Sequence, residues 1–159
     1  DFLGNMPLNQ NACRSLMSKH TLIVMQHFSN KITDIHYDEE LDIIRINYKG
    51  FAISNLYRQA VEKTLEVALE NRCTKWLITQ HDFRGVSPND TQWLAETWSP
   101  QIVRKFKELG IDERRKTAIV KSEDVFADYI ARRVADDLQA EEDNKIFDNE
   151  QDALTWLLE

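Results

Sequence analysis

The sequence predicts an α/β domain with a mixed β-sheet, in which antiparallel strands come first and βα units follow. Within the stretch 41–48, Ile44, Ile46 and Tyr48 alternate with polar residues, as in a half-buried strand. Beyond it, short apolar strands at 76–79 and 117–120 are separated by stretches with helical periodicity. Short strands that alternate with helices pair in parallel through right-handed crossovers. We therefore expect an antiparallel meander joined to a parallel sheet.

Length, composition and charge limit the classes of protein to which this chain can belong. The chain has 159 residues, 42% hydrophobic and 30% charged, so one globular domain is expected. The formal net charge of -7 argues against nucleic-acid binding, which needs clustered Lys and Arg. Cys13 and Cys73 show no metal-ligand spacing, and we expect reduced thiols in a cytoplasmic protein. No apolar run has the length of a membrane span, so no stable membrane insertion is expected.

Residues 1–16 form a polar, Asn-rich leader, and residues 17–159 form the single predicted domain. We interpret Met17 as a natural start and the leader as a trimmed or foreign tail. Ordering a backbone costs about 1–2 kcal/mol per residue, which only burial or strand pairing can offset. We predict that the leader is extended and packs on its own domain or on a second copy. Its apolar anchors are Phe2, Leu3, Met6 and Leu8.

The antiparallel strands are expected at 21–28, 32–37 and 41–48, the last two as a hairpin around Asp38–Glu40. Gly50 is expected to end this meander. A helix over 55–71 follows. Its apolar side chains recur on one face, and its charged side chains cover the other.

The stretch 75–90 is the centre of the chain. We expect a buried strand, a polar loop over 81–86 and the start of a helix. Ser87–Pro88 is a good helix start, and Asp90 stands close to the position of the acid in a capping box. Ligands of open α/β sheets bind outside the carboxyl ends of the strands, so this loop is the first place to look for a site.

The helix after Pro88 carries Trp93 and Trp98, which we expect to face the sheet or a neighbouring helix rather than water. Ser99–Pro100 repeats the signal of a cap followed by proline, so the helix should bend or restart there. Gly110 is a natural residue to end it.

After the strand at 117–120, Ser122 is expected to cap a further helix. Residues 141–143 are expected to end that helix in solvent. A minimal strand at 145–147 and a last helix behind a capping box at Asp148–Gln151 complete the chain. The predicted core face of the helix after Ser122 is Val125, Phe126, Tyr129, Ile130, Val134 and Leu138.

His81, Asp82 and Arg84 form a tight polar cluster at the expected end of the central strand. One interpretation is acid–base chemistry or anion binding near a helix N-terminus, with Ser87 as a neighbour. The other is a surface loop whose Asp and Arg pair with each other or with the backbone.

Large aromatic side chains offer a second kind of site. Tyr57, Trp93, Trp98 and Phe106 would line an apolar ligand pocket or simply fill the core. The four histidines share no ligand spacing, although His27 and His36 fall opposite each other on neighbouring strands. No nucleophile elbow or Gly-rich phosphate loop is present. We therefore predict no catalytic residue, no metal and no cofactor.

Three segments resemble the SpoIIAA-like, STAS-type domains, which have the fold of the anti-sigma factor antagonists. They are Ile43–Gly50, the strand Lys75–Ile78 with Trp93, Leu94 and Trp98 after it, and Ile146–Asp148 with Ala153–Leu157. The resemblance covers most of 17–159 and implies a SpoIIAA-like (STAS) sandwich. The antagonists carry a phosphorylated serine in an Asp-Ser-Ser-Gly-like segment. This chain has Thr79–Asp82 at that place, so the serine switch is not carried over.

The resemblance implies a non-catalytic bacterial module that regulates or binds ligands, with a distant likeness to lipid-binding SEC14-type domains. We expect it to act through protein contacts, a homodimer included, or through a small apolar ligand. The alternative is an enzyme of unknown class that uses His81, Asp82 and Arg84. An enzyme should bury His81 in a cleft near a carboxylate, whereas a binding module should leave it solvated.

Overall fold

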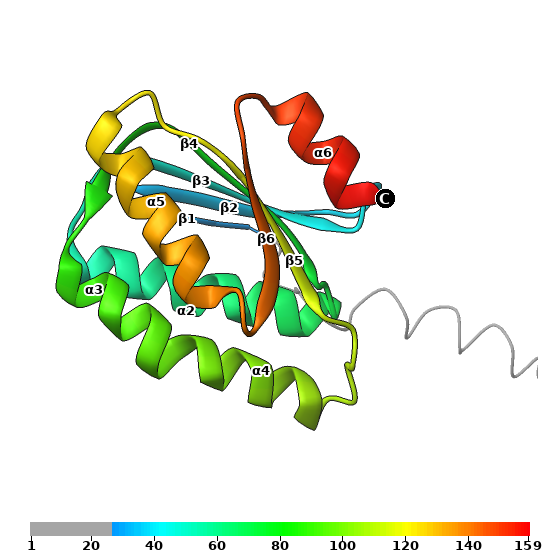
Figure 1. Ribbon diagram of the computed structural model, residues 1–159. Coiled ribbons are helices and arrows are strands. Elements are labelled where there is room, and N and C mark those ends of the chain that lie inside the picture. The colour runs from blue at the N-terminus through cyan, green and yellow to red at the C-terminus, as the bar shows by residue number, and fades with distance from the viewer. Residues whose placement is uncertain (1–26) are drawn as a thin grey trace, which may run out of the picture.

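In the computed structural model, which describes residues 27–159, one six-stranded sheet carries helices on both faces (Figure 1). Neighbouring strands pair antiparallel from β1 to β3 and parallel from β3 to β6. The predicted mixed sheet is thereby confirmed. In spatial and chain order the strands are β1 (His27–Ser29), β2 (Thr33–Asp38), β3 (Ile43–Ala52), β4 (Lys75–Val86), β5 (Arg115–Val120) and β6 (Glu142–Phe147).

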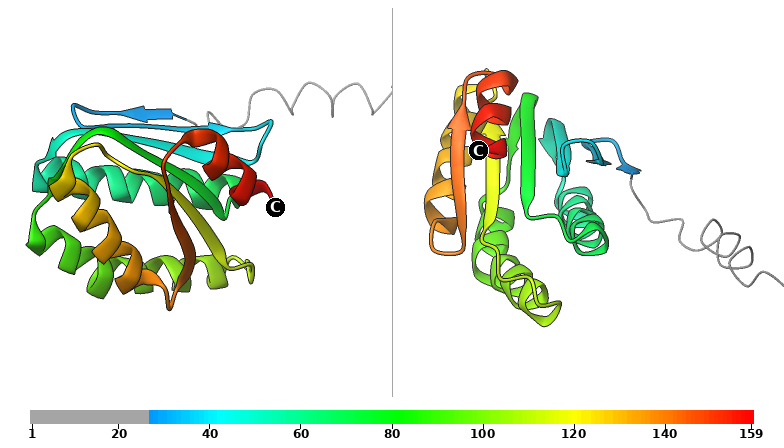
Figure 2. Two further views of the ribbon diagram at one scale, coloured as in Figure 1. Left: turned by 45° about the horizontal axis from the view of Figure 1, so that its top comes forward. Right: turned by 90° about the vertical axis from the view of Figure 1, so that its right-hand side faces the viewer.

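Three crossovers connect the parallel strands, and all pack on one face of the sheet. They are α2 (Ser54–Asn71), then α3 (Pro88–Trp93) with the π-helical η1 (Leu94–Trp98) and α4 (Ser99–Glu108), and finally α5 (Val125–Leu138). The last helix, α6 (Glu150–Leu158), packs on the other face. Figure 2 shows α2 and α4 side by side beneath the strands, with α6 on the far side of the sheet from both. The leader over 1–16 and most of the expected strand 21–28 lie outside the described residues.

Strand alternation divides the core into two layers. Trp76 faces the three crossovers, and its neighbour Leu77 faces α6, because successive strand side chains point to opposite faces. Ala118 and Val120 of β5 also face α6, where Leu157 is fully buried. The larger layer, beneath the crossovers, contains the candidate site.

The central strand is longer than predicted, so the expected polar loop over 81–86 is wrong. β4 continues to Val86, and β3 continues beyond Gly50 to Ala52. The two extensions pair through an irregular register that shifts twice, and the pairing ends with Ala52 opposite Val86. Gly50 and Gly85 both have positive φ, which lets the backbone turn at these irregularities without ending the strands.

The buried face of α5 differs from the prediction. Ala127, Ala131 and Ala135 recur every four residues and face the sheet, whereas Val125 and Phe126 are 84% and 51% exposed. Tyr129 is also exposed. Ile130 and Val134 are partly buried and Leu138 is buried, as expected. The side of α5 that faces the sheet is therefore a row of small side chains.

Several helix termini also differ from the prediction. Asp124 caps α5, because its carboxylate accepts a hydrogen bond from the Ala127 N–H at 2.9 Å. Ser122 instead donates to the Phe83 carbonyl at 2.6 Å. The box of the last helix begins at Asn149 rather than Asp148. Ser87 caps α3 as predicted, accepting from the Asp90 N–H at 3.2 Å.

Candidate functional site

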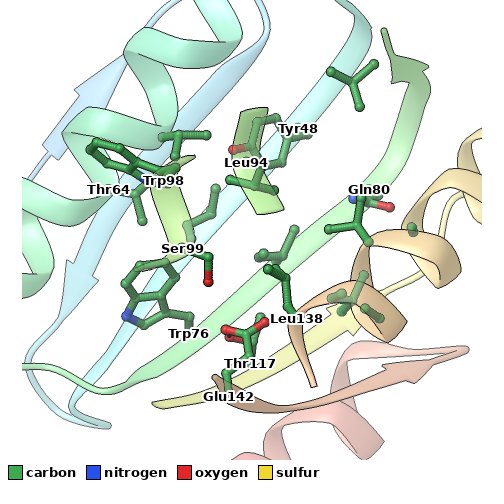
Figure 3. Close-up of a pocket in the computed structure, with 18 of the residues that line it drawn as sticks. Tyr48, Thr64, Trp76, Gln80, Leu94, Trp98, Ser99, Thr117, Leu138 and Glu142 are labelled. Atoms are coloured by element: carbon green, nitrogen blue, oxygen red, sulfur yellow. Dashed lines mark hydrogen bonds between the residues drawn. The ribbon is translucent and has the colours of Figure 1, made fainter. Parts of the chain in front are cut away.

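A cavity of about 100 Å³ lies between the sheet and the helices η1, α4 and α5 (Figure 3). Its floor is the crossover face of the strands, where Ile46, Ile78 and Ile119 stand side by side in register. The alanine row of α5 explains the open space, because Ala131 and Ala135 project only one carbon toward these isoleucines. The cavity therefore follows from a row of small side chains above a flat apolar floor.

The cavity is partly open to the surface, and we place its mouth where lining residues of η1 and α5 are partly exposed. Leu94 of η1 and Ile130 and Val134 of α5 line it and remain partly exposed. Ile78 is also partly exposed, although it lies in the middle of the central strand. Solvent thus reaches the sheet floor through this mouth, which gives a small molecule a way in.

One end of the cavity holds a buried ion pair. Arg115 and Glu142 occupy facing positions at the starts of β5 and β6, and their side chains are 8% and 4% exposed. The Arg115 Nε donates to Glu142 Oε2 at 2.5 Å, and Arg115 Nη2 pairs with the same carboxylate. Thr117 donates to that oxygen at 2.9 Å. The Arg115 guanidinium lies 4.6 Å from the centre of the Trp76 ring, a cation–π geometry that holds it in place.

Three buried polar atoms in the cavity wall have no hydrogen-bond partner within residues 27–159. They are Arg115 Nη1, Trp98 Nε1 and Gln80 Oε1. Buried polar groups are nearly always hydrogen-bonded, and one left unpaired costs about 1–3 kcal/mol. Two of these atoms are donors and one is an acceptor, and all three belong to residues that line the cavity.

The polar groups are spread along the length of the cavity. Figure 3 shows Trp76, Thr117 and Glu142 together at one end and Gln80 toward the other. Gln80 follows Trp76 by four residues in β4, which corresponds to about 13 Å along a strand. Ser99 stands between the two ends, and its hydroxyl donates to Glu141 at 2.7 Å.

Two members of the aromatic set predicted from the sequence line the cavity, namely Tyr57 and Trp98. Tyr57 lies beside Tyr48 with ring centres 5.9 Å apart. Burial, together with the nearby Asp90, raises the pKa of the Tyr57 phenol, so it stays neutral. Phe106 is buried in the same core layer but does not line the cavity.

Trp93 belongs to the layer behind the cavity wall. Its ring stacks on Trp98 at 5.5 Å, and the Arg58 guanidinium covers it at 4.6 Å. Trp98 is buried as expected, whereas Trp93 remains partly exposed. Trp93 therefore positions the Trp98 ring rather than meeting the contents of the cavity.

Ser87 belongs to a separate network around the fully buried carboxylate of Asp90. Asp90 accepts hydrogen bonds from Ser54 at 2.6 Å, Ser87 at 2.7 Å and Arg58 at 2.9 Å. Burial opposes ionisation of Asp90, but these three hydrogen bonds outweigh it and hold the pKa of the carboxyl below its ordinary value. The network joins the starts of α2 and α3 and has a structural role.

His81, Asp82 and Arg84 lie on the extended β4, away from the cavity lining. All three side chains are exposed, and none makes a side-chain hydrogen bond or ion pair within the described part of the chain. Phe83, between them, is buried. An enzyme site at His81 requires a cleft and a carboxylate in reach; among residues 27–159, His81 does not line the cavity and is hydrogen-bonded to no carboxylate side chain.

The residues missed from the sequence are Gln80, Arg115 and Glu142. Residues 141–143 were expected in solvent, but Glu142 opens β6 and is buried, because its strand starts three residues earlier than predicted. Arg115 likewise opens β5 two residues before the predicted start. Alternate residues of a strand point to the same face, so a strand extended two residues back from Thr117 would have placed Arg115 on the crossover face.

Within residues 27–159, no group of three His, Cys, Asp or Glu side chains is arranged to hold a metal ion. His27 and His36 are opposite each other, as their spacing predicts. His27 Nε2, however, lies 2.7 Å from Asp34 Oδ1. No helix over the same residues is long and apolar enough to cross a membrane.

Comparison with known proteins gives one informative match. No protein-family model and no curated protein matches this sequence. The fold is similar to the crystal structure of an uncharacterized protein from the DUF3478 family with a SpoIIAA-like fold, from Shewanella loihica PV-4. The two share 20% identity at a TM-score of 0.46, over 82% of this chain and 98% of that chain. That protein is described as having a SpoIIAA-like fold. The likeness concerns the fold alone, so the site is interpreted from this chain's own residues.

Proposed function

We propose that this protein is a non-catalytic domain that binds a small, mostly apolar molecule in the cavity beneath α5. The observation that carries this proposal is the set of three unpartnered polar atoms in an apolar cavity with an open mouth. A ligand with matching polar groups would satisfy Arg115 Nη1, Trp98 Nε1 and Gln80 Oε1 while burying its apolar body on the isoleucine floor.

The energetics favour an occupied cavity. Apolar atoms that filled 100 Å³ of packed space would contribute at most about 2.4 kcal/mol, at about 24 cal/mol per Å³, and the open mouth lowers this limit. Partners for the unpaired polar atoms would add to that gain. An apolar cavity of about 150 Å³ in another protein takes up benzene. The cavity here therefore fits part of a ring-sized molecule, and the remainder would lie in the mouth beside Leu94 and Ile130.

The indole N–H signals of the four tryptophans test this proposal. In a ¹⁵N–¹H spectrum, toluene should shift the signals of Trp76 and Trp98, which line the cavity, and leave that of Trp156 unchanged. Trp156 is a matched control because it packs on the α6 face. The shifts should saturate and should disappear in Ala135→Leu, which fills the cavity.

Native mass spectrometry of freshly purified protein provides an independent measurement. A retained small molecule should appear as a mass increment that is lost in Ala135→Leu. If native spectra show no increment and toluene leaves the Trp76 and Trp98 signals unmoved, the proposed ligand-binding role is wrong.

A second candidate function is regulation through protein contacts. Phe51, Ile53, Val125, Phe126 and Tyr129 are all more than half exposed, and we call them the strand-end patch. Phe51 pairs with Gly85, and the Phe126 ring covers Gly85, so β3, β4 and α5 contribute to one surface. Contiguous exposed apolar side chains of this size commonly mark interfaces.

A second copy of this chain is the first partner to test. Sedimentation of the intact protein over a range of concentrations should show self-association that Phe126→Ser weakens. A concentration-independent monomer mass would remove the homodimer as an explanation of the patch.

A further inference from the structure

Resting on the proposed ligand-binding role, we infer that the Arg115–Glu142 end of the cavity selects neutral carbonyl compounds over carboxylates. An arginine beside an apolar cavity usually indicates an anionic ligand, such as a fatty acid. The geometry here points the other way, because the charge of this arginine is already paired inside the protein.

The guanidinium of Arg115 retains one free donor group and no free charge. Its Nε and Nη2 both contact the Glu142 carboxylate, and only Nη1 has no partner within residues 27–159. Thr117 donates to the same carboxylate oxygen and holds it in place at 2.9 Å. An N–H without a partner needs an acceptor, and a neutral carbonyl oxygen meets that need.

A second carboxylate, on the residue before Glu142 in the chain, lies beside the cavity. Glu141 accepts a hydrogen bond from Ser99, another lining residue, at 2.7 Å. Arg114, which donates to the Glu142 carbonyl, and Arg115 carry two positive charges, and Glu141, Glu142 and Asp143 carry three negative charges, so the local sum is -1. An anionic ligand at Nη1 would lie beside these carboxylates in a poorly solvated site, where like charges repel strongly.

The remaining polar atoms extend the pattern. Trp98 Nε1 is a second donor and would also accept a carbonyl or ether oxygen as partner. Gln80 Oε1, toward the other end, needs a ligand N–H or O–H group. The ligand class that fits is thus a small neutral molecule with a carbonyl acceptor and an amide or hydroxyl donor on an apolar body.

Benzamide and benzoate form a matched pair of probes, since they share ring and shape and differ in charge at pH 7. Toluene is the apolar reference. Titration of the Trp98 indole signal in the intact protein should give a benzamide Kd at least tenfold lower than the benzoate Kd. Benzamide should also bind more tightly than toluene, because only benzamide partners the unpaired donors.

Glu142→Gln removes the negative charge and keeps the side-chain shape. It should tighten benzoate binding at least tenfold and lower the ratio of the benzoate Kd to the benzamide Kd by a similar factor. If this variant fails to fold, Glu141→Gln removes a partly exposed charge instead of a buried one. It should lower the benzoate Kd about threefold. The wild-type comparison stands without either variant.

The outcomes separate the two proposals. If none of the three probes moves the Trp98 signal, the ligand site and this inference fall together. If toluene or benzamide binds and benzoate binds as tightly as benzamide, the ligand site stands and the selection against anions is wrong. Benzoate binding that Glu142→Gln leaves unchanged would also overturn the inference.

Discussion

Filling the cavity should stabilise the protein while abolishing ligand binding. Ala135→Leu adds three carbon atoms beneath α5, at a position that lines the cavity and is 7% exposed. Each buried methylene contributes about 0.8 kcal/mol, which gives an upper limit of about 2.4 kcal/mol. The cavity cost of about 24 cal/mol per Å³ gives the same figure for 100 Å³. Some strain is inevitable in a packed core, so the expected gain is about 1–2 kcal/mol.

Ala127→Leu is the matched control. Ala127 lies two turns earlier on the same alanine row and is fully buried, but it does not line the cavity. The same substitution there forces three carbons into packed space and should destabilise the protein by about 1–3 kcal/mol. Helix propensity is nearly equal for Ala and Leu. The difference in free energy of unfolding between the two variants therefore depends on how much space lies between each position and the sheet.

Chemical denaturation with urea measures both variants as changes in the free energy of unfolding. For a domain of this size, 1 kcal/mol corresponds to about 2–4 °C in Tm, so Ala135→Leu should melt several degrees higher. Ala131→Leu, one turn earlier, tests the same space from a second position. If all three leucine variants destabilise the protein by similar amounts, the cavity is not free space and the reasoning behind the ligand site is wrong.

Three further predictions follow from the buried polar groups. Asp90→Asn should cost about 1–3 kcal/mol at neutral pH, because the buried carboxylate that accepts from Ser54 and Ser87 is lost, whereas solvent screens the loss of charge pairing with the 42% exposed Arg58. The pKa of Asp90 is lower in the folded protein than the unfolded value of about 3.9, so the stabilisation is fully present above that value. The difference in free energy of unfolding between wild type and variant, measured with urea, should therefore shrink as pH falls through the folded-state pKa. A difference that does not depend on pH would contradict this prediction. Ser87→Ala should cost about 2 kcal/mol through loss of the cap and of one donor to Asp90, and an unchanged midpoint would show that neither bond matters. Burial raises the pKa of the Cys73 thiol to about 12, so in Cys13→Ser protein a thiol reagent should react slowly until the chain unfolds; fast reaction in the native state would disprove this.

The fold was predictable from the sequence because periodicity and order determine it. The alternation through Ile44 and Ile46 marks a half-buried strand, and the apolar run at 76–79 marks a central strand. Strand ends were not predictable, because β4 stays in the sheet through polar residues such as His81. The irregular pairing of β3 with β4, at two glycines with positive φ, keeps that extension in place.

The site was largely hidden from sequence analysis. Tyr57 and Trp98 were singled out because they are large and aromatic, and both line the cavity. Arg115 and Glu142 are 27 positions apart, and each looks like a surface charge in its own segment. Only the register of β5 against β6 brings them together, and a register between distant strands is a tertiary property.

The arrangement of α5 is the observation that best supports the proposal of a ligand site. A helix selected for stability alone would bury its large side chains, each worth about 1.5–3 kcal/mol, and expose its alanines. Here Val125 and Phe126 are exposed, and Ala131 and Ala135 face the sheet above the isoleucine floor. Such exceptions to the usual burial of large side chains are expected at functional sites, where function offsets the lost stability. The same reversal explains why the amphipathic pattern of this helix predicted the wrong buried face. The misleading residues are those that form the strand-end patch and the cavity.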